Sequence, residues 1–151
     1  MKVLTVCLGN ICRSPAAQGI LEYKARMKGV FLEVDSAGTA GYHVGSAPDR
    51  RSIETLRKRK IDISQQKARQ ISTQDFYDFD WVLVMDRSNL RNVLAICPAG
   101  FEHKVTLIGC LPNGQDHGEV ADPYYGNHDG FEVMADHLDG LADDFLALIR
   151  K

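Results

Sequence analysis

The sequence has no long apolar run and almost no net charge. No stretch of its 151 residues approaches a membrane-spanning length, and the apolar run Val3 to Val6 is too short for a signal peptide. Lys and Arg number 18 against 20 Asp and Glu, which gives a net charge of −2. So small a charge excludes a strong general attraction to nucleic acid or to an anionic membrane.

Cysteine is also scarce. The four cysteines are Cys7, Cys12, Cys97 and Cys110. They are too few for a secreted disulfide scaffold, and a reducing compartment would keep them as thiols. A zinc site using Cys7 and Cys12 would need two more ligands, and no second Cys or His pair offers them at a usual spacing. The sequence therefore predicts a cytoplasmic protein with no metal, no cofactor, no membrane insertion and no nucleic-acid partner, in which Cys97 and Cys110 are structural.

Length and composition suit one domain over residues 1–151, with 44% apolar and 25% charged residues. Strands are expected at 3–6, 31–34, 81–85 and 104–108, and helices at 16–28, 49–58, near 76, at 87–96 and at 131–149. This alternation predicts an α/β fold, a four-stranded parallel sheet with helices on both faces. Ligands bind such sheets beyond the carboxyl ends of the strands, where Cys7 stands after the first strand.

The segment from Cys7 to Pro15, Cys-Leu-Gly-Asn-Ile-Cys-Arg-Ser-Pro, links that strand to a helix. Helix N-termini carry unpaired N–H groups and partial positive charge, so a loop curled there can hold an anion. Gly9 permits a left-handed backbone, and Asn10 is among the residues that tolerate one. Pro15 suits the first helical turn. The segment therefore predicts a phosphate loop after strand one.

The same loop carries the residues for phosphoryl transfer. The positive cradle stabilises a thiolate at Cys7, which is the nucleophilic form of cysteine. Arg13, six positions on, can grip two phosphate oxygens with its planar fork. Ser14 can donate its hydroxyl to the thiolate when Cys7 becomes the leaving group. The loop is neither a Walker loop nor a dinucleotide fingerprint, because it lacks Gly-Lys-Ser/Thr and three spaced glycines.

Expulsion of an oxygen leaving group from phosphorus also needs a proton donor, for which Asp122 is the candidate. Pro123 stiffens its loop, and a bound phosphate dianion favours the protonated form of a neighbouring carboxyl. Tyr124 and Tyr125 are placed to wall a cleft, and Tyr42 can supply the facing wall. For Asp86, which follows the third strand, a catalytic role is open, but capping of the next helix is favoured. The five histidines, His43, His103, His117, His128 and His137, are scattered and need no catalytic role.

With these motifs the sequence resembles the low-molecular-weight protein tyrosine phosphatases over nearly the whole chain. The matching segments are 7–15, 35–39, 68–71, 84–86 and 122–127. The resemblance implies a phosphocysteine intermediate on Cys7, proton donation by Asp122 and a phosphotyrosine-containing protein as substrate. It implies that phosphate or another oxyanion binds Arg13 and the amides of Leu8, Gly9, Asn10, Ile11, Cys12 and Arg13. It also implies a polar network of Asn10, Ser14 and Ser36, and cleft walls at Tyr42 and Tyr124.

Three positions depart from the family pattern. Gln18 stands where an acidic residue is frequent, Gln66 where many members carry a histidine, and Tyr42 where some carry tryptophan. These departures concern substrate preference and loop stability rather than the chemistry. The resemblance further suggests that Cys12 is a resolving thiol that forms a disulfide with oxidised Cys7.

Other functions of similar loops stay open. An arsenate reductase needs a relay of further cysteines, whereas Cys97 and Cys110 are separated in sequence. A protein-arginine phosphatase tends to carry threonine in place of Ile11. A phosphocysteine carrier module of a sugar transport system would not need Arg13 together with Asp122.

Overall fold

Four parallel strands form the centre of the molecule in a computed structural model that describes residues 1–112, 116–124, 126 and 128–150. The strands are β1 (Lys2–Cys7), β2 (Glu33–Gly38), β3 (Trp81–Val84) and β4 (Val105–Leu107). Their order in the sheet is β2-β1-β3-β4, and every pairing is parallel. Cys7 pairs with Gly38, so β1 and β2 end at the same edge of the sheet.

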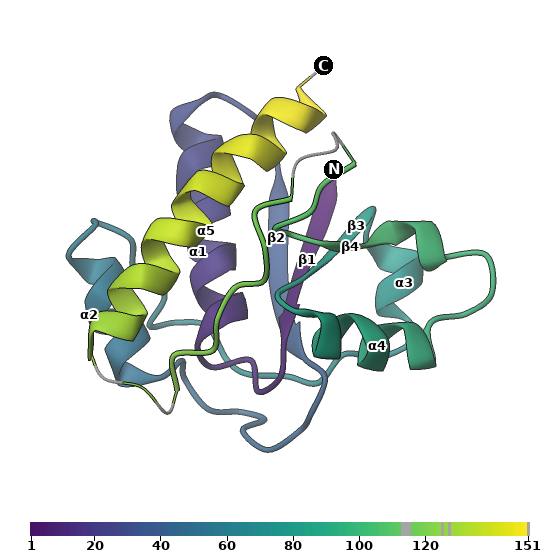
Figure 1. The fold of residues 1–151 in the computed structure, drawn as a ribbon, viewed down its shortest axis with the longest axis horizontal. Helices are drawn as coiled ribbons and strands as arrows, with labels where there is room; N and C mark the ends of the chain where they lie inside the picture. Colours follow the sequence, from purple (N-terminus) through teal and green to yellow (C-terminus); the bar gives the residue numbers. More distant parts are fainter. Residues whose placement is uncertain (113–115, 125, 127, 151) are drawn as a thin grey trace.

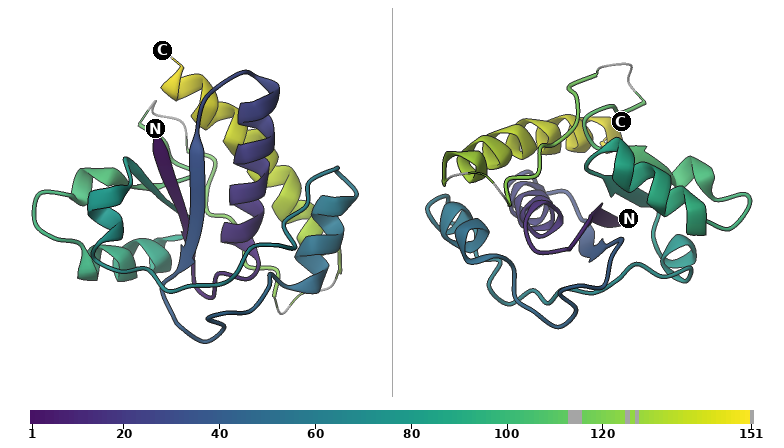
Figure 2. Two further views of the ribbon diagram at one scale, coloured as in Figure 1. Left: turned by 180° about the vertical axis from the view of Figure 1, so that it is seen from behind. Right: turned by 60° about the horizontal axis from the view of Figure 1, so that its bottom comes forward.

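Helices cover both faces of this sheet. They are α1 (Arg13–Met27), α2 (Arg50–Arg57), α3 (Asp75–Asp78), α4 (Arg87–Ile96) and α5 (His128–Ile149), with a 3-10 turn at Glu102–Lys104. Figure 1 shows α1, α2 and α5 on one side of the sheet and α3 and α4 on the other, and the views in Figure 2 agree. The predicted α/β fold, a four-stranded parallel sheet with helices on both faces, is confirmed.

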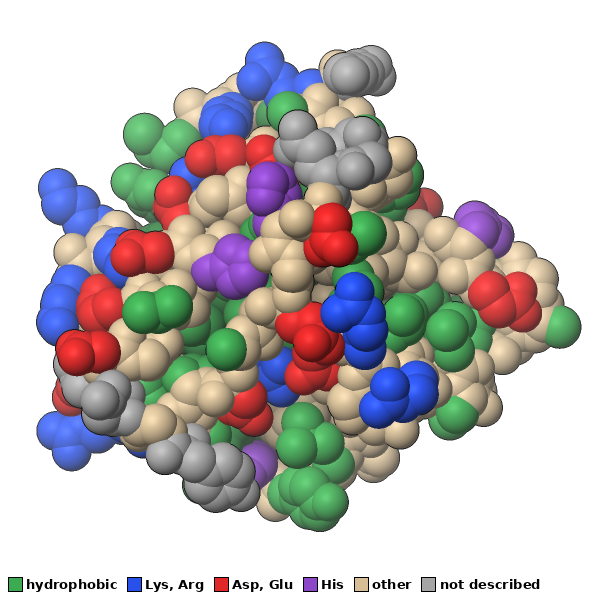
Figure 3. Space-filling model, viewed as in Figure 1, with side chains coloured by type: hydrophobic (Ala, Val, Ile, Leu, Met, Phe, Trp, Pro, Cys, Tyr) green, Lys and Arg blue, Asp and Glu red, His purple; other side chains and the backbone are tan. Residues whose placement is uncertain are grey.

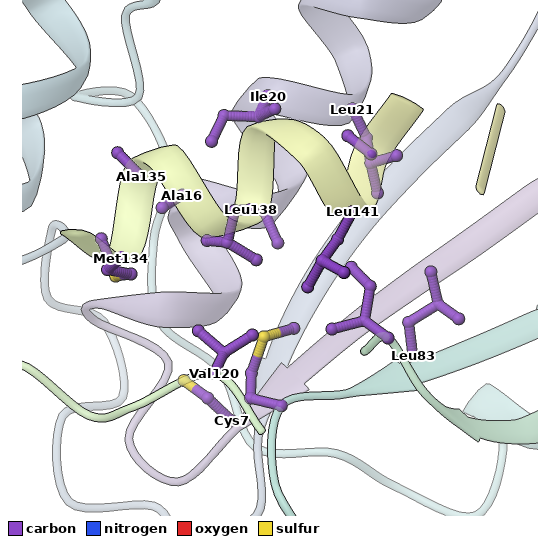
Figure 4. Packing of buried hydrophobic residues seen from close by; sticks show 14 of the residues in the cluster. Cys7, Ala16, Ile20, Leu21, Leu83, Val120, Met134, Ala135, Leu138 and Leu141 are labelled. Carbon is purple, nitrogen blue, oxygen red and sulfur yellow. The ribbon is translucent and has the colours of Figure 1, made fainter. Parts of the chain in front are cut away.

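Alternation along β1 builds a core on each face. Val3 and Cys7 belong to the larger cluster, which joins β1 to α1 and α5, whereas Leu4 and Val6 belong to the cluster under α3 and α4. Both faces of a central parallel strand are buried, which explains its continuous apolar run. Figure 4 shows the larger cluster, with side chains of α1 and α5 meeting above the sheet and Cys7 at its edge.

Several predicted boundaries were wrong. The second strand was expected at 31–34, with a loop beginning at 36, but it occupies Glu33–Gly38, and Phe31 is 82% exposed. Its last residue, Gly38, lies against the phosphate loop. A Cβ on Gly38 would lie 2.8 Å from the carbonyl oxygen of Leu8. The first helix begins at Arg13 rather than at residue 16, so Pro15 lies third in the helix, where a missing N–H is still tolerated.

The remaining elements fall close to their predicted places. The helix at 87–96 is confirmed, and Asp49 caps α2 by accepting a hydrogen bond from the Arg51 amide. The final helix begins three residues earlier than expected, at His128 rather than 131. Within the described part of the chain, none of the helices combines the length and apolar character needed to traverse a bilayer. Figure 3 shows basic and acidic side chains interspersed over one face, as the small net charge leads one to expect.

Candidate active site

A pocket opens at the carboxyl edge of the sheet, above the end of β1. Its lining residues are Cys7, Leu8, Gly9, Ile11, Cys12, Arg13, Tyr42, His43, Asp122 and Tyr124. Cys7 is the last residue of β1 and is only 3% exposed, so its sulfur forms part of the pocket floor. The fold therefore brings together the predicted nucleophile, the predicted arginine and the predicted acid. Asn10 and Ser14, by contrast, lie behind the loop and are buried.

The loop between β1 and α1 depends on Asn10. This residue has a φ of +57°, in the left-handed region that the sequence indicated for Gly9 or Asn10. Its Nδ2 donates to Ser14 Oγ at 2.8 Å and to Ser36 Oγ at 3.0 Å, and its Oδ1 accepts from the Arg69 amide at 2.9 Å. The side chain thus fixes the loop to α1, to β2 and to the segment after α2. Gly9 has a different constraint, because a Cβ there would lie 3.1 Å from His43 Cδ2.

Ser14 lies directly beneath the sulfur. Its Oγ is 3.0 Å from Cys7 Sγ and 3.3 Å from the carbonyl oxygen of Ala37. Because Asn10 donates to this hydroxyl, Ser14 keeps its single proton for Cys7 or for Ala37. The hydroxyl can therefore donate to a thiolate on Cys7.

Arg13 is held by groups on the far side of the pocket. Its Nη1 donates to Asp86 Oδ2 at 2.6 Å and to the Val120 carbonyl at 3.0 Å, while its Nη2 lies 3.6 Å from Asp122 Oδ2. Burial lowers the pKa of Arg13, but the negative charges of Cys7, Asp86 and Asp122 outweigh burial and raise it. The guanidinium is therefore a fixed positive charge with two donors already directed away from the pocket.

Asp122 and Tyr124 form another part of the pocket wall. The Asp122 side chain is 37% exposed, and its Oδ1 accepts a hydrogen bond from the Tyr124 amide at 3.0 Å. The rings of Tyr42 and Tyr124 each lie 6.5 Å from the ring of His43, so the three aromatics line one side of the opening. Tyr125, also predicted to wall the cleft, lies outside the described residues, as does Asn127 of the same motif.

Cys12, the residue before α1, is a buried thiol that also lines the pocket. Burial raises its pKa far above the ordinary value, and the charges of Asp49, Cys7 and Asp122 act in the same direction. Cys7 and Cys12 are both free in this structure. Cys12 is therefore protonated at neutral pH and is a weak nucleophile while it stays buried.

Sequence reasoning did not assign two residues to the site. His43 lines the pocket although no catalytic role was expected of any histidine, and its position next to Tyr42 was the one signal in the sequence. Asp86 caps α4 as predicted, through the Asn89 amide at 2.7 Å, but its second oxygen also binds Arg13. Among the residues with described positions, no three His, Cys, Asp or Glu side chains gather as a potential metal-binding group.

The departures from the family pattern also have defined positions. Gln66 Nε2 donates to the Pro15 carbonyl at 3.1 Å, so it contacts the first turn of α1. Gln18 Nε2 donates to the Val34 carbonyl at 3.2 Å and so links α1 to β2. Both glutamines therefore brace α1 rather than line the pocket.

Known proteins with similar sequences match this chain over nearly their whole length. A Synechocystis protein named for a low molecular weight protein-tyrosine-phosphatase is 46% identical over 154 residues, covering 100% of this chain and 98% of its own. The low molecular weight phosphotyrosine protein phosphatase of Schizosaccharomyces pombe is 42% identical over 152 residues, covering 99% of this chain and 97% of its own.

Solved structures agree with the sequence comparison. A protein tyrosine phosphatase from Entamoeba histolytica, crystallised with Hepes in its active site, superposes with a TM-score of 0.92 at 32% identity, covering 99% of this chain and 97% of its own. Residues 2–151 match the family described as low molecular weight phosphotyrosine protein phosphatase. The chain therefore belongs to the low molecular weight phosphotyrosine protein phosphatase family.

Proposed function

We propose that this chain hydrolyses phosphotyrosine in proteins through a cysteinyl-phosphate intermediate on Cys7. The observation that carries the proposal is the 3.0 Å contact between Cys7 Sγ and Ser14 Oγ at the floor of a pocket that Arg13 and Asp122 also line. The site therefore holds a thiol that can attack phosphorus, a hydroxyl and a fixed cation that can stabilise negative charge, and a carboxyl that can protonate the leaving oxygen. Family membership supports the choice of a phosphotyrosine substrate.

In the first step, the Cys7 thiolate attacks phosphorus and forms a sulfur–phosphorus bond. The bond between phosphorus and the tyrosine oxygen breaks, and its electron pair goes to that oxygen. Asp122 donates a proton to the departing oxygen, so tyrosine leaves as a neutral phenol. The position of Asp122 in the wall of the pocket, partly open to solvent, allows contact with that oxygen.

Arg13 stabilises the charge on the transferring phosphoryl group. Its Nη1 is engaged by Asp86 and by the Val120 carbonyl, so the Nε–Nη2 edge is the one assigned to the phosphate oxygens. Asp86 therefore orients the fork before substrate arrives, which favours the geometry of the transition state. The amides of residues 8–13 supply the remaining donors, at the N-terminal end of α1.

In the second step, water attacks the phosphocysteine, and Asp122, now ionised, accepts a proton from that water. The sulfur–phosphorus bond breaks and returns its electron pair to Cys7. Ser14 donates its hydroxyl to the developing thiolate, which makes sulfur a better leaving group. A hydrogen bond to a charged group contributes about 1.5–3 kcal/mol, enough to matter for the rate of this step.

The pocket walls suit an aryl group on the phosphate. Tyr42, His43 and Tyr124 line the same pocket as Cys7, with neighbouring ring centroids 6.5 Å apart. A benzyl-bearing phosphonate is bound by Vibrio vulnificus Wzb, whose structure superposes on this chain with a TM-score of 0.83 at 27% identity. Offset and edge-on packing of aromatic rings would place a phosphotyrosine ring in the same opening.

Substitution of the nucleophile and the acid tests the proposal. Cys7→Ser should abolish turnover while the fold is kept, because a serine hydroxyl stays protonated and is a poor nucleophile. Asp122→Asn should lower kcat/KM by about a hundredfold on weakly acidic phenols and much less on strongly acidic ones. Equal losses across the phenol series would remove Asp122 from the role of general acid.

The substrate class needs a separate assay. Peptides carrying phosphotyrosine, phosphoserine or phosphoarginine should be compared at the same concentration, and rapid release is expected from phosphotyrosine alone. Faster release from phosphoarginine would favour the protein-arginine phosphatase. A stable phosphocysteine without turnover would favour the carrier module, and reduction of arsenate with thiols would favour the reductase.

A further inference from the structure

Arg51, near the start of α2, contacts the segment that carries Asp122. Its Nη2 donates to the Tyr124 carbonyl at 3.1 Å, and its guanidinium carbon lies 5.4 Å from the centroid of the Tyr124 ring. The same guanidinium lies 4.6 Å from the centroid of the Phe131 ring, on α5. Arg51 therefore touches both the backbone and the ring of Tyr124, from an element 73 residues away in the sequence.

The guanidinium is itself held in place by Asp49. Arg51 Nε donates to Asp49 Oδ1 and Nη2 donates to Oδ2, each at 3.0 Å, in a two-point fork. The hydrogen bond from Arg51 also lowers the pKa of Asp49, so the carboxylate of this pair stays charged over the neutral range. A forked pair with one orientation leaves Arg51 little freedom to leave Tyr124.

The start of α2 also holds the phosphate loop. The Asp49 amide donates to the Ile11 carbonyl at 2.7 Å, and Ser52 Oγ donates to the Cys12 carbonyl at 3.1 Å. Ser52 is fully buried. Within residues 49–52, Asp49 and Ser52 thus contact the loop that carries Cys7, and Arg51 contacts the segment that carries Asp122.

We propose that Arg51 is a positioning residue that sets the place of Asp122 relative to Cys7. It acts through Tyr124, whose carbonyl accepts from Arg51 and whose amide donates to Asp122 Oδ1 at 3.0 Å. The inference rests on the proposed function, because it assigns to Arg51 the alignment of the proton donor with the leaving oxygen. Misplacement of a reacting group by about 1 Å can cost as much as a hundredfold in rate.

Arg51 also packs on Phe131, so a purely structural role has to be distinguished. If Arg51 has only a structural role, its substitution should lower the activity toward every substrate alike and should also lower the free energy of unfolding. A positioning role lowers the rate of proton transfer and therefore affects substrates with weakly acidic phenols most. The dependence of kcat/KM on the acidity of the leaving phenol separates the two roles.

The experiment compares Arg51→Met with Arg50→Met in a series of aryl phosphates. Arg50 precedes it on the same helix, but its side chain is 90% exposed and pairs only with Glu54 among the described contacts, so it controls for lost charge. Methionine keeps most of the apolar stem and removes the fork. Asp122→Asn and the double variant Arg51→Met/Asp122→Asn complete the cycle.

For Arg51→Met we expect a loss of about tenfold in kcat/KM on the least acidic phenol and less than about twofold on the most acidic. The double variant should match Asp122→Asn within about twofold, and Arg50→Met should match the wild type. A uniform loss across the series, or full additivity with Asp122→Asn, would overturn the inference. If Asp122→Asn itself shows no dependence on the leaving group, the proposed acid step fails and the inference falls with it.

Folding of each variant is checked by urea unfolding before the kinetics. If Arg51→Met does not fold, Arg51→Lys replaces it, since lysine keeps the charge and stem but cannot bond Asp49 and Tyr124 through a planar fork. The same criterion then applies: a loss confined to weakly acidic phenols supports the inference, and a uniform loss or no loss overturns it.

Discussion

Replacing Asn10 by alanine removes three hydrogen bonds, two buried and one partly buried, and leaves an ordinary residue at a φ of +57°. Each such bond contributes about 1 kcal/mol net, so the free energy of unfolding should fall by about 3 kcal/mol. The left-handed backbone adds about 1 kcal/mol for alanine, which lacks the polar side chain that makes this conformation tolerable. The combined loss is a large share of the stability of a small domain.

Asn10→Gly separates the two effects. Glycine adopts the left-handed conformation without steric cost. The Asn10→Gly variant should therefore be more stable than the alanine variant by about 1 kcal/mol, although it also lacks the three hydrogen bonds. Urea unfolding followed by circular dichroism gives the free energies, and kcat/KM on an aryl phosphate gives the activity. Both variants should lose most activity, because Ser14 is no longer oriented by Nδ2.

Lys60 supplies a matched control. It is the other non-glycine residue with a positive φ, +67°, among the described residues, and it is exposed in the turn after α2. Lys60→Gly should be as stable as the wild type or more stable, by about 1 kcal/mol at most, with unchanged activity. If Asn10→Ala were as stable as the wild type, or more stable than Asn10→Gly, the reasoning would be refuted.

Three further outcomes test other parts of the site. Arg13→Lys should lower kcat/KM nearly as much as Arg13→Ala, because an ammonium cannot bind Asp86 and phosphate through one planar fork; stopped assays on both variants check this. Activity should survive EDTA and be blocked by orthovanadate, since Arg13 and the loop amides supply the positive charge. After mild peroxide, dithiothreitol should restore the activity of the wild type but not that of Cys12→Ser. Because burial raises the pKa of Cys12, the Cys7–Cys12 disulfide should form faster as pH rises, which peptide mapping can follow.

Local signals in the sequence were sufficient for the sheet and for the phosphate loop. A buried strand that ends in cysteine, followed by Gly9, Asn10 and a proline within the next helical turn, specifies that loop within a single stretch of chain. Asp122-Pro123 is equally local. These segments could be read because each is a feature of neighbouring residues, and the parallel fold then places them at one edge.

Contacts between distant segments could not be read in the same way. Phe31 was assigned to the second strand, but the strand occupies Glu33–Gly38, and its last residue lies so close to the Leu8 carbonyl that a Cβ there would meet the loop. The link from Arg51 to Tyr124 spans 73 residues and has no local pattern. The second role of Asp86 was hidden in the same way, because helix capping already accounted for the residue in sequence terms.

The most direct test of the account is to identify the covalent intermediate. Wild-type enzyme is mixed with a phosphotyrosine peptide, quenched in acid within one turnover, digested and mapped by mass spectrometry. The account predicts phosphate on the sulfur of Cys7, accumulating in step with the dephosphorylated peptide and absent from Cys7→Ser. Phosphate found on another residue, or turnover with no phosphorylated Cys7 at any quench time, would contradict it.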